Sequence, residues 1–198
     1  MSSRLGPAYR TSTLRRVLVA CALLLGLGQA PTARGAEQAS EYQLKAAFLF
    51  HFTSFIEWPE RAFAGPDAPF RLCLVGGDPF GAAIKSLESK TYRGRRIVVE
   101  ALGGEIAAGH CQIVYFNGRV PAEMRALAQE GAGQAVLTVS SEDAFTEQGG
   151  MIQFVPVEGR VRIQVNLAAA RAANLRVSAK LLEVAVKVID SNAGQARS

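Results

Sequence analysis

The pattern of apolar and polar positions changes its period once, near the C-terminus, and this change is the clearest structural signal in the chain. Two apolar-rich runs, Met151–Val157 and Val161–Leu167, are joined across Glu158-Gly159-Arg160. A glycine between two β-branched runs is typical of a hairpin. Apolar and polar residues alternate along the second run, which predicts a strand with one buried face.

After Ser178 the apolar spacing becomes that of a helix. The stripe consists of Leu181, Leu182, Ala185, Val186 and Ile189. Ser178 is expected to cap this helix, because its hydroxyl can accept hydrogen bonds from the free amides of the first turn. The stretch holds no obvious nucleophile, metal cluster or phosphate loop. We interpret it as a docking surface on a strand pair with a supporting helix.

A second helix is predicted over Glu41–Trp58, where apolar residues occur nearly all round. Such a helix is either sandwiched in the core or shared with a second subunit. Pro59 should end it, because the residue before a proline is pushed out of the α region. We expect this helix to form part of a homodimer interface.

Between these two segments, apolar strands alternate with helices. The expected strands are Phe70–Val75, Arg96–Leu102, Cys111–Phe116 and Ala135–Val139, and the expected helical pieces are Ala82–Ser89, Pro121–Glu130 and a turn at Ser141–Phe145 capped by Ser141. Thr91–Gly94 should form a turn. This alternation predicts an α/β fold, with a single domain over residues 41–190. Its central sheet would be mostly parallel and flanked by helices, with an antiparallel hairpin near the C-terminus.

The formal net charge of +5 arises entirely before Glu37, in a segment that holds five arginines and no acidic residue. That segment has the layout of a secretory signal peptide, with a basic region ending at Arg16 and an apolar run over Val17–Leu27. We therefore predict a cleavable signal peptide over residues 1–36. Leu18-Val19-Ala20-Cys21 resembles a lipobox, but Cys21 lies inside the apolar run. Without the leader, the domain has no basic excess with which to bind nucleic acid.

Two cysteines remain after the leader, Cys73 and Cys111. The residues leave two states open, a pair of buried free thiols and a disulfide that closes a loop of about 38 residues, worth about 3–4 kcal/mol. We favour the disulfide, because an exported chain meets an oxidising compartment. A thiol enzyme with His51 or His110 as base is a weaker hypothesis, because His110 and Cys111 would face opposite sides of one strand.

Other chemistry has little support in the sequence. No metal-ligand spacing occurs, no serine lies in a nucleophile elbow, and no cofactor is expected. The glycine-containing loop Gly76–Gly81 could cradle a phosphate, but Asp78-Pro79 is better interpreted as the cap and first residue of a helix. We keep as an alternative function a small-ligand sensor whose cleft lies near Gly76–Gly81.

An ordered set of segments resembles the YfiR family of exported bacterial regulators. The segments are Ala46–Phe50 with Phe55–Pro59, Leu72–Gly76 with Asp78–Gly81, Val136–Val139, Gly149–Ile152, and Val161–Leu167 continuing through Leu175–Leu182. The resemblance covers nearly all of residues 41–190. It implies a non-catalytic periplasmic protein that binds and represses a membrane-bound diguanylate cyclase and thereby controls cyclic-di-GMP signalling.

The resemblance also implies partners and positions. It implies a homodimer, binding to the periplasmic domain of the inner-membrane cyclase, sequestration by an outer-membrane lipoprotein, and a Cys73–Cys111 disulfide. Some members have a second cysteine pair where this chain has Thr146 and Gln153. The implied partner-binding residues are Met151, Ile152, Gln164 and Ala170, of which Ala170 is too small to be a hydrophobic anchor.

Overall fold

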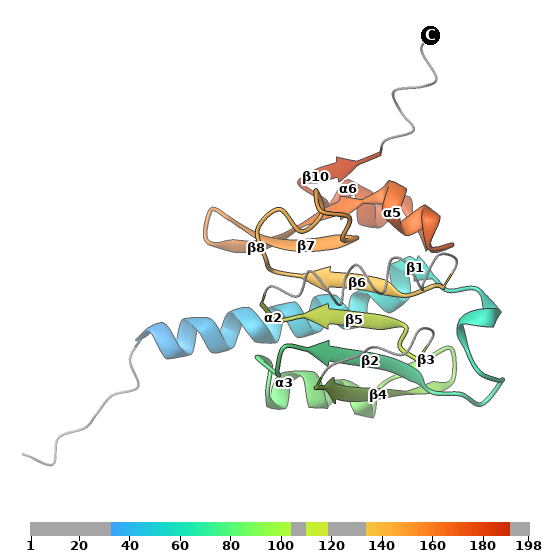
Figure 1. Ribbon diagram of the computed structural model, residues 1–198. Coiled ribbons are helices and arrows are strands. Elements are labelled where there is room, and N and C mark those ends of the chain that lie inside the picture. Colours follow the sequence, from blue (N-terminus) through green and yellow to red (C-terminus); the bar gives the residue numbers. More distant parts are fainter. Residues whose placement is uncertain (1–32, 104–109, 119–133, 191–198) are drawn as a thin grey trace, which may run out of the picture. The chain divides into compact units, whose positions relative to one another are not determined.

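The computed structural model describes residues 33–103, 110–118 and 134–190. The chain divides into two compact units, residues 1–37 and 38–198. The second unit is an α/β domain (Figure 1). Helix α2 (Ala33–Phe55) begins before this unit, but most of its residues belong to it. Residues 1–32, with Cys21, and the predicted helix Pro121–Glu130 lie outside the described residues. Within the described ranges, no helix is both long and apolar enough to cross a membrane.

One sheet dominates the second unit. Its described strands lie in the order β10-β8-β7-β6-β5-β2-β4-β3. Their bounds are β2 (Phe70–Val75), β3 (Thr91–Tyr92), β4 (Arg95–Leu102), β5 (Ile113–Phe116), β6 (Leu137–Ser140), β7 (Ile152–Val157), β8 (Arg160–Asn166) and β10 (Lys187–Ile189). Neighbours are parallel except in the β7–β8 and β3–β4 pairs. The predicted fold class is therefore confirmed.

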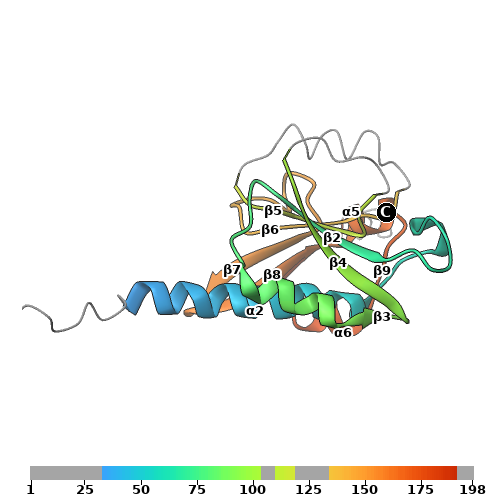
Figure 2. The same cartoon turned by 90° about the horizontal axis from the view of Figure 1, so that it is seen from below.

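Short elements complete the domain. They are the antiparallel pair β1 (Ile56–Glu57) and β9 (Arg176–Val177), the helices α3 (Ala82–Lys85), α5 (Leu167–Ala172) and α6 (Ala179–Glu183), and the 3₁₀ turns η1 (Glu60–Ala62) and η2 (Ser86–Ser89). Helices α2 and α6 lie on the same face of the sheet (Figure 2).

The central strands are apolar on both faces because each face is covered. In β2, Leu72 and Leu74 belong to the main core beneath α2, whereas Cys73 and Val75 belong to a smaller cluster on the opposite face. Phe154 of β7 meets α2 directly, with ring centroids 5.8 Å from Phe48 and 6.0 Å from Phe52. A strand that is covered on both faces appears in the sequence as a continuous apolar run. The bounds of β2 could therefore be predicted correctly from the sequence.

The hairpin predicted near the C-terminus is confirmed. Val157 pairs with Arg160, so the loop contains two residues, Glu158 and Gly159, both with positive φ (51° and 71°). Two-residue loops with positive φ match the twist of the flanking strands. Arg160, which we expected in the loop, is the first residue of β8.

Both long predicted helices end earlier than expected. Helix α2 stops at Phe55, three residues before Trp58, because Ile56 and Glu57 pair with Val177 and Arg176 of β9. Helix α6 keeps the predicted Ser178 cap, whose Oγ accepts from the amide of Leu181 at 3.3 Å, but it ends at Glu183.

The apolar stripe after α6 therefore belongs to a strand. Lys187–Ile189 form β10, which pairs in parallel with Gln164–Asn166 of β8. The amide of Val186 donates to the carbonyl of Ile163 at 2.9 Å. Three β-branched residues within four positions favour a strand once a partner edge is within reach, and no local signal reveals that edge.

Three loop predictions also need correction. Asp78 caps no helix: its Oδ1 accepts from the amides of Phe80 and Gly81 in a turn, and α3 begins only at Ala82. The segment after β6 is a turn without a helix, and Ser140 rather than Ser141 accepts from the Glu142 amide. Thr91 and Tyr92 belong to a strand, which leaves Arg93-Gly94 as the turn to β4.

Cys73 and Cys111 form the expected disulfide, with their Cα atoms 6.0 Å apart. Both are fully buried, in the smaller core cluster with Val114 and Phe116. The disulfide therefore joins β2 to the segment that enters β5, on the face opposite α2. A free thiol at either position is excluded in this structure.

A charged cluster lies beside the disulfide, on the edge of β4. The two carboxylate oxygens of Glu100 bind Arg71 and, at 2.7 Å, His110 Nε2. Burial alone would raise the pKa of Glu100, but the hydrogen bond with His110 and the charge of Arg71 outweigh it and lower the pKa below its ordinary 4.5. A carboxyl whose pKa falls on folding stabilises the protein at higher pH and loses that contribution as pH falls through the folded-state pKa.

We expect this cluster to contribute to acid sensitivity. Glu100→Gln should lower the melting temperature at neutral pH, and the difference from the wild type should shrink as pH falls below 4.5. Thermal unfolding of both proteins across a pH series measures this. A melting-temperature difference that stays constant from about pH 7 to about pH 3 would contradict the assignment.

A buried polar network joins the turn after β6 to the hairpin. Thr146, fully buried, donates its amide to Gln153 Oε1 at 3.3 Å, and its carbonyl accepts from Asn166 Nδ2 at 2.9 Å. The Thr146 hydroxyl lies 3.3 Å from Gln164 Oε1. Hydrogen bonds thus hold together Thr146 and Gln153, the positions where the family resemblance placed a second cysteine pair in other members.

Candidate partner-binding cleft

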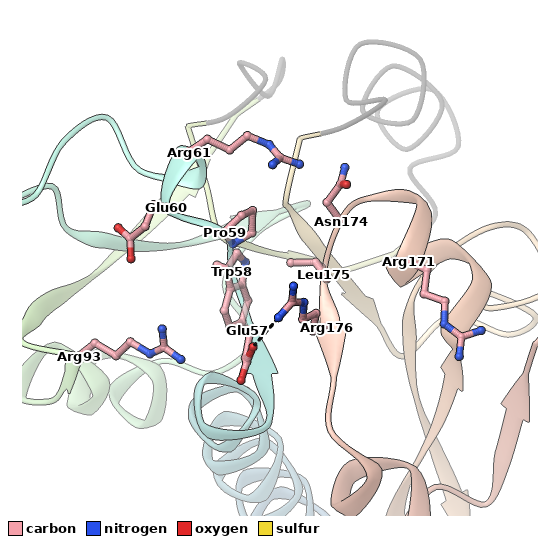
Figure 3. A pocket seen from close by; sticks show the side chains of 10 residues that line it. All are labelled: Glu57, Trp58, Pro59, Glu60, Arg61, Arg93, Arg171, Asn174, Leu175 and Arg176. Atoms are coloured by element: carbon pink, nitrogen blue, oxygen red, sulfur yellow. Dashed lines mark ion pairs between the residues drawn. The ribbon is translucent and has the colours of Figure 1, made fainter.

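An open cleft of about 520 Å³ lies where the β1–β9 pair meets the β3–β4 turn and the end of α5 (Figure 3). Four arginines line it: Arg61, Arg93, Arg171 and Arg176. They come from four segments spread over more than half of the domain. The acidic residues of the lining are Glu57 and Glu60, so its formal charge is positive.

The β1–β9 pair builds the centre of the cleft. Glu57 lies opposite Arg176 in the register, and their side chains approach to 3.9 Å. Both are largely exposed, at 58 and 87 % of their side-chain surface, so this ion pair is worth little and can be exchanged for another partner. Arg176 therefore remains accessible to an incoming acidic group.

The wall beside β9 is set by the end of α5. Asn174 takes a left-handed conformation (φ 59°), and the amide of Leu175 turns back to the carbonyl of Ala170 at 2.9 Å. This is the chain reversal by which helices commonly end, with asparagine in place of glycine. It buries Leu175, exposes Asn174, and directs the chain into β9.

The floor is rigid because Trp58 is packed on all sides. Its Nε1 donates to the carbonyl of Gln112 at 3.1 Å, and its ring meets Phe70 and Tyr92 edge-on with centroids 5.0 and 5.7 Å apart. Trp58 is 3 % exposed. Its backbone, followed by Pro59, therefore carries Glu57 and Arg61 on a fixed support.

Two of the four arginines have no carboxylate partner among the described residues. Arg171 binds both oxygens of Asp190, at 2.9 and 2.8 Å, and Arg176 faces Glu57. Arg61 and Arg93 are exposed and make no such pair within the described ranges. Figure 3 shows both reaching from one side of the cleft toward the α5–β9 side. The cleft is thus suited to carboxylate or phosphate groups, which arginine binds through its planar fork.

The four predicted partner-binding residues have different surroundings. Ile152 is 1 % exposed, Ala170 1 % and Met151 8 %, whereas Gln164 is half-buried. The docking surface that we predicted on this strand pair is therefore not exposed at Ile152, because α2 covers that face, as the contacts of Phe154 with Phe48 and Phe52 show. Ala170 lies next to Arg171 at the cleft. No contact in the structure tests a partner-binding role for these residues, which stays a prediction.

The loop Gly76–Gly81 is already occupied by its own contacts. The amides of Phe80 and Gly81, which a phosphate would need, donate to Asp78 Oδ1 at 2.7 and 3.1 Å. Gly76 packs against the end of β5, where Asn117 Nδ2 donates to its carbonyl at 3.1 Å. The loop amides that a phosphate would need are therefore already occupied, and we place the candidate ligand site in the arginine-lined cleft instead.

Sequence reasoning missed all four arginines of the cleft. Arg61 and Arg176 are separated by more than a hundred residues, and neither belongs to a recognisable motif. The one available signal was the family resemblance, because Arg61 closely follows the segment Phe55–Pro59 and Arg176 lies within the segment Leu175–Leu182.

Comparison with known proteins supports that resemblance. A search of curated proteins finds no match to the chain. The model of the YfiR/HmsC-like family matches residues 42–186, which includes the β1–β9 pair, the disulfide, and the four arginines of the cleft. Since this match covers well over half of the chain, the protein is a member of the YfiR/HmsC-like family.

Proposed function

We propose that this protein is a periplasmic regulator that binds and represses a membrane-bound diguanylate cyclase. The observation that carries the proposal is the family match over residues 42–186, because this family acts in the periplasm, in regulation of diguanylate cyclase signalling rather than in catalysis. Repression itself, the cyclase partner, sequestration by an outer-membrane lipoprotein, homodimer formation and export by a cleaved leader over residues 1–36 are parts of the proposal.

The arginine cleft is our candidate for the partner-binding surface. Arg61 and Arg93 both line the cleft, and they are exposed cations without a carboxylate partner in the described part of the chain. An acidic segment of a partner would gain charge-assisted hydrogen bonds here without displacing a buried ion pair. Charge complementarity of this kind mainly sets partner choice and association rate.

Deletion and complementation in the native cell test this proposal. Loss of the protein should raise intracellular cyclic-di-GMP, and the wild-type chain should restore the low level. A variant with Arg61→Glu and Arg93→Glu should fail to restore it and should no longer capture a membrane cyclase in a pull-down. The matched control is Arg96→Glu, which changes an exposed arginine of β4 outside the cleft.

The outcomes separate the parts of the proposal. A deletion that leaves cyclic-di-GMP unchanged, with no membrane cyclase captured, contradicts the repressor function. A deletion that raises the messenger, together with a cleft variant that still represses, contradicts only the assignment of the cleft. Charged substitutions at Ile152 are unsuitable for this test, because a charge at that buried site would unfold the domain.

A small-ligand sensor remains the second candidate function. The cleft volume of about 520 Å³ is within the range of small-molecule sites, and its arginines favour an anionic ligand. Thermal unfolding in the presence of small carboxylates and phosphates tests it: a saturable rise in melting temperature that Arg61→Glu and Arg93→Glu remove would support this function.

A further inference from the structure

The sheet has an open edge at its C-terminal end, formed by β10 and the first half of β8. β10 pairs only with Gln164–Asn166 of β8, so Arg160–Arg162 pair only with β7. In the described ranges no strand lies against the outer side of β10. Figure 1 shows β10 at the end of the sheet, next to β8. We call this surface, over residues 160–162 and 186–189, the open edge.

The backbone of β8 points hydrogen-bonding groups toward the open edge. The amide of Asn166 donates to the carbonyl of Met151, beside β7, whereas the carbonyl of Ile163 accepts from Val186 on the other side. Because these directions alternate along an antiparallel strand, the N–H and C=O of Val161 point away from β7, into the open edge. Unpaired groups of this kind are a template for another extended chain.

The two faces of the open edge differ in character. Val188 pairs with Val165, and Val165 with Ile152, which places Val188 on the same face as the main core. Val186 and Val188 are nevertheless 49 and 40 % exposed. On the opposite face Arg160 and Arg162 are exposed and make no ion pair with any described residue.

The arginines on one face and the exposed valines on the other favour one kind of binding partner. A second copy of the chain paired with β8 across a twofold axis at Val161 would bring Arg160 and Arg162 against the same two arginines. Like charges directly opposite in a sheet are destabilising. An extended segment with acidic side chains on that face and apolar ones on the other would instead complement both the arginines and the valines.

We propose that the open edge binds an extended segment of a partner protein in which apolar and acidic residues alternate, and that this segment adds a strand to the sheet. Main-chain hydrogen bonds to the N–H and C=O of Val161 would supply affinity, and Arg160 and Arg162 would supply specificity. The inference needs only a protein partner; it does not rest on the cyclase assignment or on the arginine cleft.

Peptide binding to the full exported chain tests the proposal. The probe is a fluorescent peptide of about ten residues that alternates valine and glutamate, long enough for an average strand. Its controls are the same peptide with lysine for glutamate, and one whose backbone is N-methylated along one edge. The Val–Glu peptide should bind saturably in an anisotropy titration, and both control peptides should bind at least about tenfold more weakly.

Two further readouts decide the site. Arg162→Glu should weaken binding of the Val–Glu peptide roughly tenfold and improve binding of the Val–Lys peptide, whereas Arg96→Glu, the same change on an exposed strand elsewhere, should do neither. Amide hydrogen exchange on the wild type should show new protection at Val161. Any one of three results would overturn the proposal. The N-methylated peptide binds as tightly as the unmethylated one, the Arg162→Glu variant binds the Val–Glu peptide as tightly as the wild type, or the Val161 amide gains no protection.

Discussion

Replacing Cys73 and Cys111 together with alanine should lower the free energy of unfolding by about 4 kcal/mol. The disulfide closes a loop of 38 residues, and its loss restores conformational entropy to the unfolded chain. Both sulfur atoms are also buried in the smaller core cluster, so the variant loses packing as well. Chemical denaturation of the oxidised wild type and the variant measures the difference.

Reduction of the wild-type protein is the control for this experiment. The reduced chain retains both side chains and their volume, so it should lose most of the same stability without a cavity. A loss below about 1 kcal/mol on reduction would mean that the native contacts, rather than the cross-link, stabilise this face of the sheet. The double alanine variant would then report cavity formation alone.

Gly76→Ala should destabilise the domain by more than about 3 kcal/mol, or prevent folding. Gly76 has φ 84°, and a Cβ atom there would lie 2.0 Å from the carbonyl oxygen of Asn117. That oxygen cannot withdraw easily, because the Asn117 amide donates to the carbonyl of Val75 at 2.8 Å. The left-handed conformation adds about 1–2 kcal/mol for any residue other than glycine.

Gly77→Ala is the matched control, since its neighbouring site shares the strain without the clash. Gly77 has φ 97°, and its Cβ would meet only the side-chain Nδ2 of Asn117, at 3.9 Å. We expect it to lose only about 1–2 kcal/mol. Equal losses in the two variants, measured by denaturant unfolding, would contradict a close approach between the ends of β2 and β5.

The disulfide and Gly76 both lie where β2 contacts β5. β2 and β5 are adjacent at the centre of the sheet, and the chain leaves β2 toward β4 on one side before it returns to β5 on the other. The disulfide ties these strands together near the start of β5, and Gly76 packs against Asn117 where they end. A central pair held at both ends gives the sheet a stable centre.

Much of the fold could be predicted from sequence because its strands are buried on both faces. The continuous apolar runs around β2, β5 and β6 and the Glu158-Gly159 turn are local signals, and each corresponds to the observed element. The cysteines were interpretable for a similar reason, since only one pairing existed. The resemblance to the YfiR family likewise depended on short segments whose order is visible in the chain.

Other features were decided only by tertiary structure. The residues after Glu183 have a helix-compatible apolar spacing, yet they form β10 because the free edge of β8 offers Ile163 as a partner. Ile152 lies on a hairpin that alternates like an exposed one, yet α2 covers it. In both cases the local pattern is the same whether or not a distant element is present.

The candidate site shows the same division. By itself the sequence determined an α/β domain, a cysteine pair and a family resemblance, because each of these can be recognised in short local stretches of the chain; the leader over residues 1–36 stays a prediction. The cleft depends on Arg61, Arg93, Arg171 and Arg176, which have no common spacing and meet only when β1 pairs with β9. Charges from separate segments gain a combined function only through that long-range pairing, so the tertiary structure alone decided where this protein presents them.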